Sequence, residues 1–166
     1  MAELIAFFSR EDENYVNGQI KNLGVGNTEV AAGIIQKLTG ADLFKIEPKL
    51  AYAKSYNECI SQAQADQRRD ARPELVAYPE RMEPYDVIYL GFPNYWGTMP
   101  MAVFTFLERY DFTGKTIRPF CTHEGSGMGS SVKDIKKLCP AAKVEAGLAI
   151  RGGNVQHSER DIRDWL

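Results

Sequence analysis

The chain alternates short apolar runs with longer segments in which apolar residues recur every three or four positions. The runs at 4–8, 43–46 and 87–92 are apolar nearly throughout, which is typical of strands covered on both faces. Weaker strand patterns occupy 114–121 and 144–150. Proline is disfavoured inside a central strand. Because Pro119 lies in the first of these two, a bulge or a late start is expected there.

The segments between these runs predict helices. In residues 28–38 the apolar side chains fall on one helical face. Thr28 is the predicted N-cap of that helix, and Gly40 is its predicted end. Pro100 fits the first position of another helix, because its ring presets the helical φ angle. Further helices are predicted over 51–70, 131–139 and 158–166.

Strand and helix thus alternate five times over. This order favours an α/β fold with a doubly wound, five-stranded parallel sheet and helices on both faces. A length of 166 residues is ordinary for one domain, and no linker, repeat or low-complexity tract divides the sequence. We therefore expect a single domain over residues 1–166. Its ligand site is expected beyond the carboxyl ends of the strands, where open α/β sheets bind their ligands.

Composition and charge indicate the cellular environment of the protein and exclude some classes of binding partner. The 20 basic and 22 acidic residues give a net charge of −2, which lacks the basic excess of a nucleic-acid-binding protein. No apolar stretch approaches the ~18 residues of a membrane span, and the N-terminus has no basic region of a signal peptide. Cys59, Cys121 and Cys139 are odd in number and far apart. This spacing indicates reduced thiols in a cytoplasmic protein rather than disulfides or a metal site.

The loop after the first run ends in Gly26-Asn27-Thr28 and enters a helix directly. A helix N-terminus binds phosphate through its free N–H groups and its positive partial charge. Ser9, Asn27 and Thr28 would complete such a cradle with hydroxyls and an amide. The competing interpretation is that Thr28 only caps its helix. A dinucleotide fingerprint is rejected, because Glu29 stands where its third glycine belongs.

Two later loops carry the other unusual residues. Tyr95 and Trp96 are adjacent at the end of a central strand, where large aromatic side chains either pack against the protein or stack on a flat ligand ring. In residues 122–129, glycines at alternate positions let the backbone approach a ligand closely. Taken alone, that loop is better explained as a flexible connection. His123 is a candidate general acid, although a lone histidine more often makes only a hydrogen bond.

Together these motifs resemble the bacterial flavodoxin-like flavoproteins. The resemblance rests on Phe7-Phe8-Ser9-Arg10, Gly26-Asn27-Thr28, the motif from Gly91 to Pro100, and the motif from Phe120 to Gly127. It implies the strand order 2-1-3-4-5 and a non-covalently bound FMN. On that resemblance the FMN phosphate contacts Ser9, Asn27 and Thr28. One side of the flavin ring and its ribityl chain is lined by Pro93, Asn94, Tyr95, Trp96 and Gly97. The other edge is wrapped by Thr122, His123, Glu124, Gly125 and Gly127.

An insert distinguishes this sequence from flavodoxins with a short first loop. Residues 10–26 separate Ser9 from Asn27, where a common flavodoxin has a tight turn. The sequence resembles an extended variant of the family with Glu-Asn-Tyr after the first strand. Two alternatives stay open for the insert. It folds back over the phosphate, so that Arg10, Asn14 or Tyr15 reaches the cofactor, or it forms a surface flap.

The flavin carries the electron chemistry in such proteins, so no catalytic residue and no metal site is predicted. Two functions follow: electron transfer between redox partner proteins, or reduction of a quinone or related acceptor by NAD(P)H at the same FMN. The oligomeric state, monomer or homodimer, stays open.

Other functional classes fit less well. A phospho-receiver domain needs an aspartate where Asn94 stands, and Ser126 lacks the strand-turn-helix elbow of a serine hydrolase. A metal site at Cys121 and His123 lacks further ligands. A binding module that has lost its cofactor remains an alternative.

Overall fold

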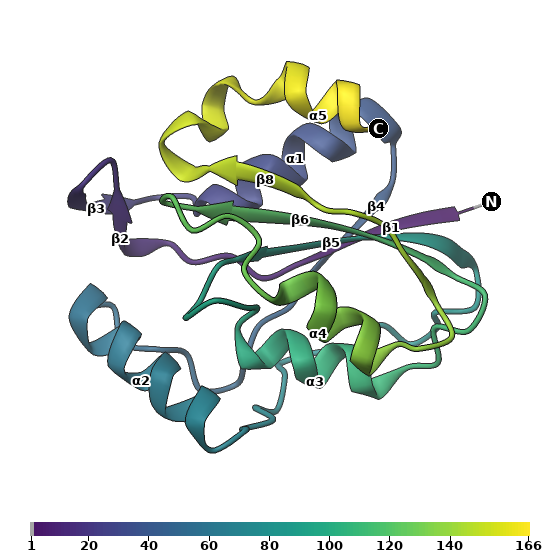
Figure 1. The fold of residues 1–166 in the computed structure, drawn as a ribbon, viewed down its shortest axis with the longest axis horizontal. Coiled ribbons are helices and arrows are strands. Elements are labelled where there is room, and N and C mark those ends of the chain that lie inside the picture. Colours follow the sequence, from purple (N-terminus) through teal and green to yellow (C-terminus); the bar gives the residue numbers. More distant parts are fainter. Residues whose placement is uncertain (1) are drawn as a thin grey trace.

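A central parallel sheet organises the fold. The computed structural model describes residues 2–166, so Met1, the first residue of the predicted domain, lies outside the described residues. The sheet order is β4-β1-β5-β6-β7, and β8 pairs with β6 beside β7 (Figure 1). Because β7 and β8 are two halves of one interrupted strand, the predicted order 2-1-3-4-5 is confirmed. The strands are β1 (Ala2–Phe7), β4 (Asp42–Lys45), β5 (Tyr85–Pro93), β6 (Thr116–His123), β7 (Lys143–Val144) and β8 (Leu148–Arg151).

Helices cover both faces of this sheet. In Figure 1, α1 and α5 lie on one face, and α3 and α4 lie on the other. The remaining helix, α2, lies beyond the carboxyl ends of the strands. The helices are α1 (Asn27–Thr39), α2 (Tyr56–Arg68), α3 (Met101–Arg109), α4 (Ser131–Leu138) and α5 (Glu159–Trp165), with a 3-10 helix at Gly152–His157. Among residues 2–166, every helix is too short or too polar to span a lipid bilayer.

Strand β1 shows why its sequence is apolar at consecutive positions. Leu4 and Ala6 pack in the cluster that includes residues of α3 and α4, whereas Ile5 and Phe7 pack in the cluster that includes residues of α1 and α5. Successive side chains of a strand point to opposite faces, so a strand buried on both sides needs an apolar residue at each position. Burial on both faces of the sheet therefore explains why the segments predicted as strands are apolar without interruption.

Pro119 is accommodated by a break in the neighbouring strand. Strand β6 begins before Pro119 and pairs with β5 without a register shift, so the predicted late start is wrong, and the irregularity lies in the partner strand, where three residues face Arg118 and Pro119. The Glu145 N–H donates to the Ile117 carbonyl, and β8 resumes pairing at Phe120. Along a strand, the backbone N–H and C=O groups of every second residue point to the same side. The backbone nitrogen of Pro119 is therefore on the same side as the Ile117 carbonyl. The proline, which has no N–H, therefore faces the gap between β7 and β8.

The insert forms a β-hairpin that the sequence reading did not predict. Strands β2 (Asp12–Val16) and β3 (Gln19–Leu23) pair antiparallel around Asn17-Gly18. Asn17 and Gly18 have φ angles of 52° and 81°, as a type I′ turn requires. The Asn-Gly pair was the available signal. It was missed because the flanking residues are mostly polar and exposed, so they lack the alternation of a half-buried strand.

The start of α1 differs from the prediction. Gly26 is the N-cap, and Thr28 lies inside the first turn, so the predicted Thr28 cap is wrong. The capping oxygen comes from Ser9, whose Oγ accepts from the Glu29 N–H at 3.0 Å. The predicted end is confirmed, because Gly40 adopts a left-handed φ of 74°. Likewise Pro100 is the N-cap of α3 rather than its first residue.

Candidate functional site

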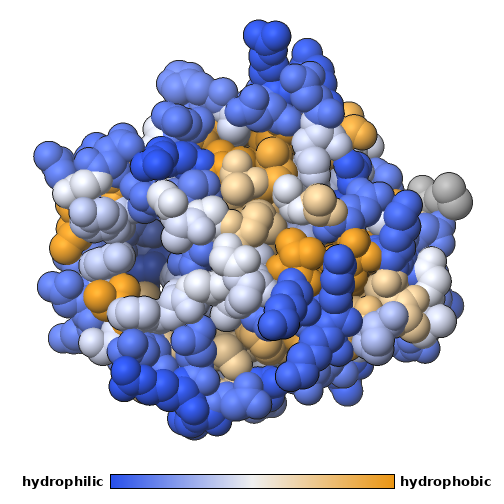
Figure 2. Space-filling model, viewed as in Figure 1, coloured by the Kyte–Doolittle hydropathy of each residue, from blue (hydrophilic) through white to orange (hydrophobic). Residues whose placement is uncertain are grey.

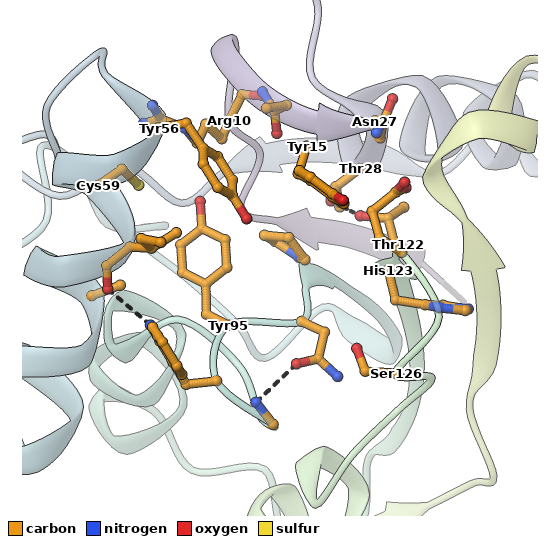
Figure 3. A pocket seen from close by; sticks show the side chains of 18 residues that line it. Arg10, Tyr15, Asn27, Thr28, Tyr56, Cys59, Tyr95, Thr122, His123 and Ser126 are labelled. Atoms are coloured by element: carbon orange, nitrogen blue, oxygen red, sulfur yellow. Dashed lines mark hydrogen bonds between the residues drawn. The ribbon is translucent and has the colours of Figure 1, made fainter. Parts of the chain in front are cut away.

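One pocket collects residues from all three loops that the sequence singled out. It lies beyond the carboxyl ends of β1, β5 and β6 and has a volume of about 500 Å³, within the usual range of ligand sites. The hairpin and α2 supply its remaining walls (Figure 3). Its lining residues are Arg10, Asn14, Tyr15, Asn27, Thr28, Tyr56, Cys59, Ile60, Ala63, Pro93, Asn94, Tyr95, Trp96, Gly97, Thr122, His123, Glu124 and Ser126.

Three predicted site residues do not line this pocket, namely Ser9, Gly125 and Gly127. Five residues that line it were not predicted: Tyr56, Cys59, Ile60, Ala63 and Ser126. The first four form the apolar stripe of α2. That stripe indicated a buried helix face, but nothing in it told whether the face meets the sheet or a ligand pocket.

The polar end of the pocket lies at the N-terminus of α1. Thr28 and Thr122 are 2 % and 4 % exposed, and their hydroxyl oxygens lie 2.7 Å apart. Ser9 already accepts from the third N–H of the helix. The N–H groups of Asn27 and Thr28 have no partner among residues 2–166. Free N–H groups at this end of a helix attract an anion.

Gly26 makes this arrangement possible by a close backbone approach. A Cβ at position 26 would lie 2.2 Å from Ser9 Oγ and 2.5 Å from the Arg10 carbonyl oxygen. Both distances are far shorter than any real contact of a Cβ atom. The segment after β1 therefore crosses the start of α1 where only glycine fits, and this crossing brings Ser9 to its capping position.

Glu124 provides an unpartnered acceptor next to the polar end. Its Oε1 accepts from the Asn17 N–H at 2.7 Å. Its Oε2 is buried and has no hydrogen-bond partner among residues 2–166. A Cβ at Gly152 would lie 2.6 Å from this oxygen, so the glycine leaves the carboxylate its space. A buried carboxylate oxygen without a donor is costly, which points to a hydroxyl or N–H of a ligand.

Aromatic residues form the other end of the pocket. Tyr95 stands in the middle of Figure 3 with its hydroxyl directed toward Tyr56 of α2. That hydroxyl is buried and has no hydrogen-bond partner within residues 2–166. Burial, and next the nearby Cys59, raise the pKa of Tyr95 well above its usual value. Tyr15 and Tyr56 lie with ring centroids 5.9 Å apart.

Arg10 brings a positive charge to this end. Its Nε donates to the Glu13 carbonyl at 2.9 Å, and its Nη2 donates to the Lys54 carbonyl at 2.8 Å. Within residues 2–166 it forms no salt bridge with a carboxylate. The guanidinium is therefore held in place by neutral groups, and its charge acts on whatever occupies the pocket.

The loop that carries Trp96 is a strained two-residue turn. Tyr95 and Thr98 pair through backbone hydrogen bonds, and Trp96 and Gly97 have φ angles of 54° and 89°. A bulky residue with a left-handed φ costs about 1–2 kcal/mol. The indole Nε1 donates to the Ile60 carbonyl at 2.9 Å, and Gln67 Nε2 donates to the Trp96 carbonyl at 3.1 Å. Trp96 therefore joins this turn to α2.

Gly125 and Gly127 shape the third loop from outside the pocket. The Gly127 carbonyl accepts from Asn94 Nδ2 at 2.8 Å, so the second and third loops are tied together. The Gly125 N–H donates to His123 Nδ1 at 2.9 Å. Desolvation, together with the Arg151 charge, lowers the pKa of His123. The ring is then neutral near pH 7 and carries its proton on Nε2.

Comparison with known proteins places this pocket in context. A family model described as flavodoxin matches residues 22–166. The chain belongs to the flavodoxin family. A comparison with the sequences of curated proteins finds no match.

Solved structures that are similar to this chain include proteins described as flavoproteins. A protein from Bacteroides eggerthii classed as a flavoprotein has 28 % sequence identity and a TM-score of 0.79, over 99 % of this chain and 95 % of that one. A similar protein from Bacteroides uniformis has 25 % identity and a TM-score of 0.77, over 98 % and 97 %. A flavoprotein from Lactobacillus acidophilus in complex with FMN shares the fold, at 18 % identity and a TM-score of 0.64, over 94 % and 97 %.

Proposed function

We propose that this flavodoxin-family protein binds FMN non-covalently and transfers electrons between redox partner proteins. The observation that carries the proposal is one pocket with a polar end at the start of α1 and an aromatic end between Tyr95 and α2. FMN has the matching chemistry, with an anionic phosphate, a chain of hydroxyls and a flat ring. Bound FMN supplies the capacity to accept and return electrons.

The start of α1 fits the phosphate. The unpartnered N–H groups of Asn27 and Thr28 lie at the positive end of the helix dipole. The Thr28 and Thr122 hydroxyls share one hydrogen bond, so a proton of the pair remains available to an anion. Ser9 caps the helix and so orders the site, and its predicted contact with the phosphate stays a prediction.

The middle of the pocket fits the hydroxyl chain. The Glu124 Oε2 atom is a buried acceptor without a donor, and a sugar-alcohol hydroxyl is a donor of the required kind. The carboxylate also repels an anion. The phosphate is therefore expected at the α1 N–H groups and the hydroxyls beside Glu124.

The aromatic end fits the flavin ring. Tyr56 and Tyr95 provide aromatic surface, and the buried Tyr95 hydroxyl can bond a polar ring atom. The Arg10 charge favours extra electron density on a neighbouring ring, whereas apolar walls disfavour a charged ring. The balance of these effects sets how easily the bound flavin is reduced.

Two buried side chains at this end of the pocket are neutral. Burial raises the pKa of both Tyr95 and Cys59. Both side chains are then neutral near pH 7, and neither is poised to exchange a proton there. The three cysteines are buried and free, which supports our proposal of a reducing, cytoplasmic location.

The proposal is tested with protein loaded with FMN and then photoreduced with EDTA as the electron donor. Mixing with an oxidised one-electron acceptor protein such as a cytochrome should reoxidise the flavin rapidly, as followed by its absorbance. NADH or NADPH oxidation with a quinone should proceed no faster than with free FMN. Rapid turnover of a nicotinamide and a quinone would instead support the alternative, an NAD(P)H-dependent reductase.

A further inference from the structure

The segment that carries α2 leaves the fold and returns at a single point. The Lys49 N–H donates to the Glu74 carbonyl and the Val76 N–H donates to the Glu47 carbonyl, both at 2.8 Å. These bonds flank the bridge between Pro48 and Leu75, and Leu75 is buried. Residues 49–74 therefore form an excursion whose two ends are held together. A segment anchored in this way can move as one unit about its base.

Helix α2 has little packing of its own. Only two of its residues are buried, Cys59 and Ala63, and both are small. By contrast, α3 is shorter and buries Met101, Val103, Phe106 and Leu107 among others. The outward surface over α2 is mainly hydrophilic (Figure 2). Since most helix stability comes from packing of an apolar face, α2 is held mainly by other contacts.

Specific polar contacts supply that attachment. Glu13 of the hairpin accepts from the Tyr56 N–H at the start of α2, at 2.8 Å. Trp96 bonds the middle and the end of the helix, through the Ile60 carbonyl and the Gln67 side chain. One of these bonds comes from the hairpin and the others come from the loop that carries Trp96, and both segments line the pocket. They form a latch, which we define as Glu13 and Trp96 with their partners on α2.

The latch residue Trp96 lies in the strained turn between Tyr95 and Thr98. Its left-handed φ of 54° is unusual for a tryptophan, and its side chain is 48 % exposed. Core packing therefore does not account for the conformation. The two-residue turn between Tyr95 and Thr98 requires this φ, and the bonds to α2 then hold the indole and the carbonyl of Trp96 in place.

We propose that α2 is a movable lid over the aromatic end of the pocket, hinged at the Pro48–Leu75 bridge and latched by Trp96. Its inner face, with Tyr56, Cys59 and Ile60, is a wall of the pocket. Closed, the lid covers the space next to Tyr95. Opening exposes that space to a planar ring, whether an entering cofactor or a second reactant.

The first test uses the protein without any cofactor, so it does not rest on the proposed function. Amide hydrogen exchange of residues 56–68 is expected to be at least about tenfold faster than that of α1. Trp96→Phe keeps an aromatic ring but removes the Nε1–H donor. It is expected to speed exchange in α2 by about threefold or more and to leave α1 unchanged.

A matched control is Tyr85→Phe at the start of β5, which removes the hydrogen bond from the Tyr85 hydroxyl to the Asp42 carboxylate. It should leave α2 exchange as in the wild type. The lid is overturned if α2 is protected as well as α1. It is also overturned if Trp96→Phe leaves α2 unchanged or speeds all helices equally.

A second test rests on the proposed function. Stopped-flow mixing measures FMN binding and release, and Trp96→Phe should speed both by similar factors, because a lid gates both directions. A faster release with unchanged binding would show that Trp96 is only a ligand contact and would overturn the gating. If no FMN binds at all, the proposed function fails, while the exchange result still decides whether α2 is a lid.

Discussion

Replacing Gly26 by alanine is expected to weaken FMN binding at least about thirtyfold, equivalent to about 2 kcal/mol. The free energy of unfolding should fall by about 1–3 kcal/mol. The added Cβ would lie 2.5 Å from the Arg10 carbonyl oxygen, so the backbone after β1 has to move. That movement takes Ser9 off the Glu29 N–H and displaces Arg10 from the pocket. Denaturant unfolding and titration by flavin fluorescence measure the two effects.

Gly33 in the same helix is the matched control. A Cβ at Gly33 meets no atom within 4 Å, and alanine is the better helix former by about 0.5–1 kcal/mol. Gly33→Ala should therefore stabilise the protein and leave FMN affinity unchanged. If both variants bind FMN as the wild type does, the crossing at Gly26 does not hold the site together.

Replacing Thr28 by valine is expected to lower the free energy of unfolding by about 1–3 kcal/mol. Valine keeps the shape of threonine but removes the hydroxyl 2.7 Å from Thr122 Oγ1. The Thr122 hydroxyl is then left buried without a partner. FMN affinity should fall by a comparable amount, because the anion loses a hydrogen-bond donor. Unfolding of the apo-protein and FMN titration separate the two losses.

The double variant Thr28→Val/Thr122→Val controls for the pair. It should cost less than the sum of the two single changes in stability, because neither hydroxyl is left orphaned. FMN affinity should stay low, since both hydroxyls are absent. Strictly additive effects on stability would show that the two threonines do not interact, and wild-type FMN affinity would remove both from the site.

The strands of the sheet could be predicted because a strand that is buried on both faces has apolar residues at consecutive positions of the sequence. In residues 4–7 of β1 and 87–90 of β5, every side chain packs in one of the two core clusters, so the apolar runs are continuous there. The three loops could be located for the same reason, because they follow these runs. The parallel arrangement then brings their ends to one rim of the sheet.

Features that depend on contacts across the chain were missed. Thr28 has the local pattern of an N-cap, yet Ser9 supplies the cap from beyond the hairpin. The stripe of Tyr56, Cys59 and Ile60 shows that a face of α2 is covered, but the pattern is the same whether protein or pocket lies opposite. The break beside Pro119 is likewise a property of the partner strand.

The most direct test of the central claim is to titrate the cofactor-free protein with FMN and, separately, with riboflavin. The two ligands share the ring and the hydroxyl chain, and only FMN has the phosphate assigned to the N-terminus of α1. We expect one FMN per chain, and riboflavin weaker by about a hundredfold, equivalent to roughly 2.7 kcal/mol. Equal affinities, or no binding of FMN, would contradict a phosphate site at Asn27 and Thr28.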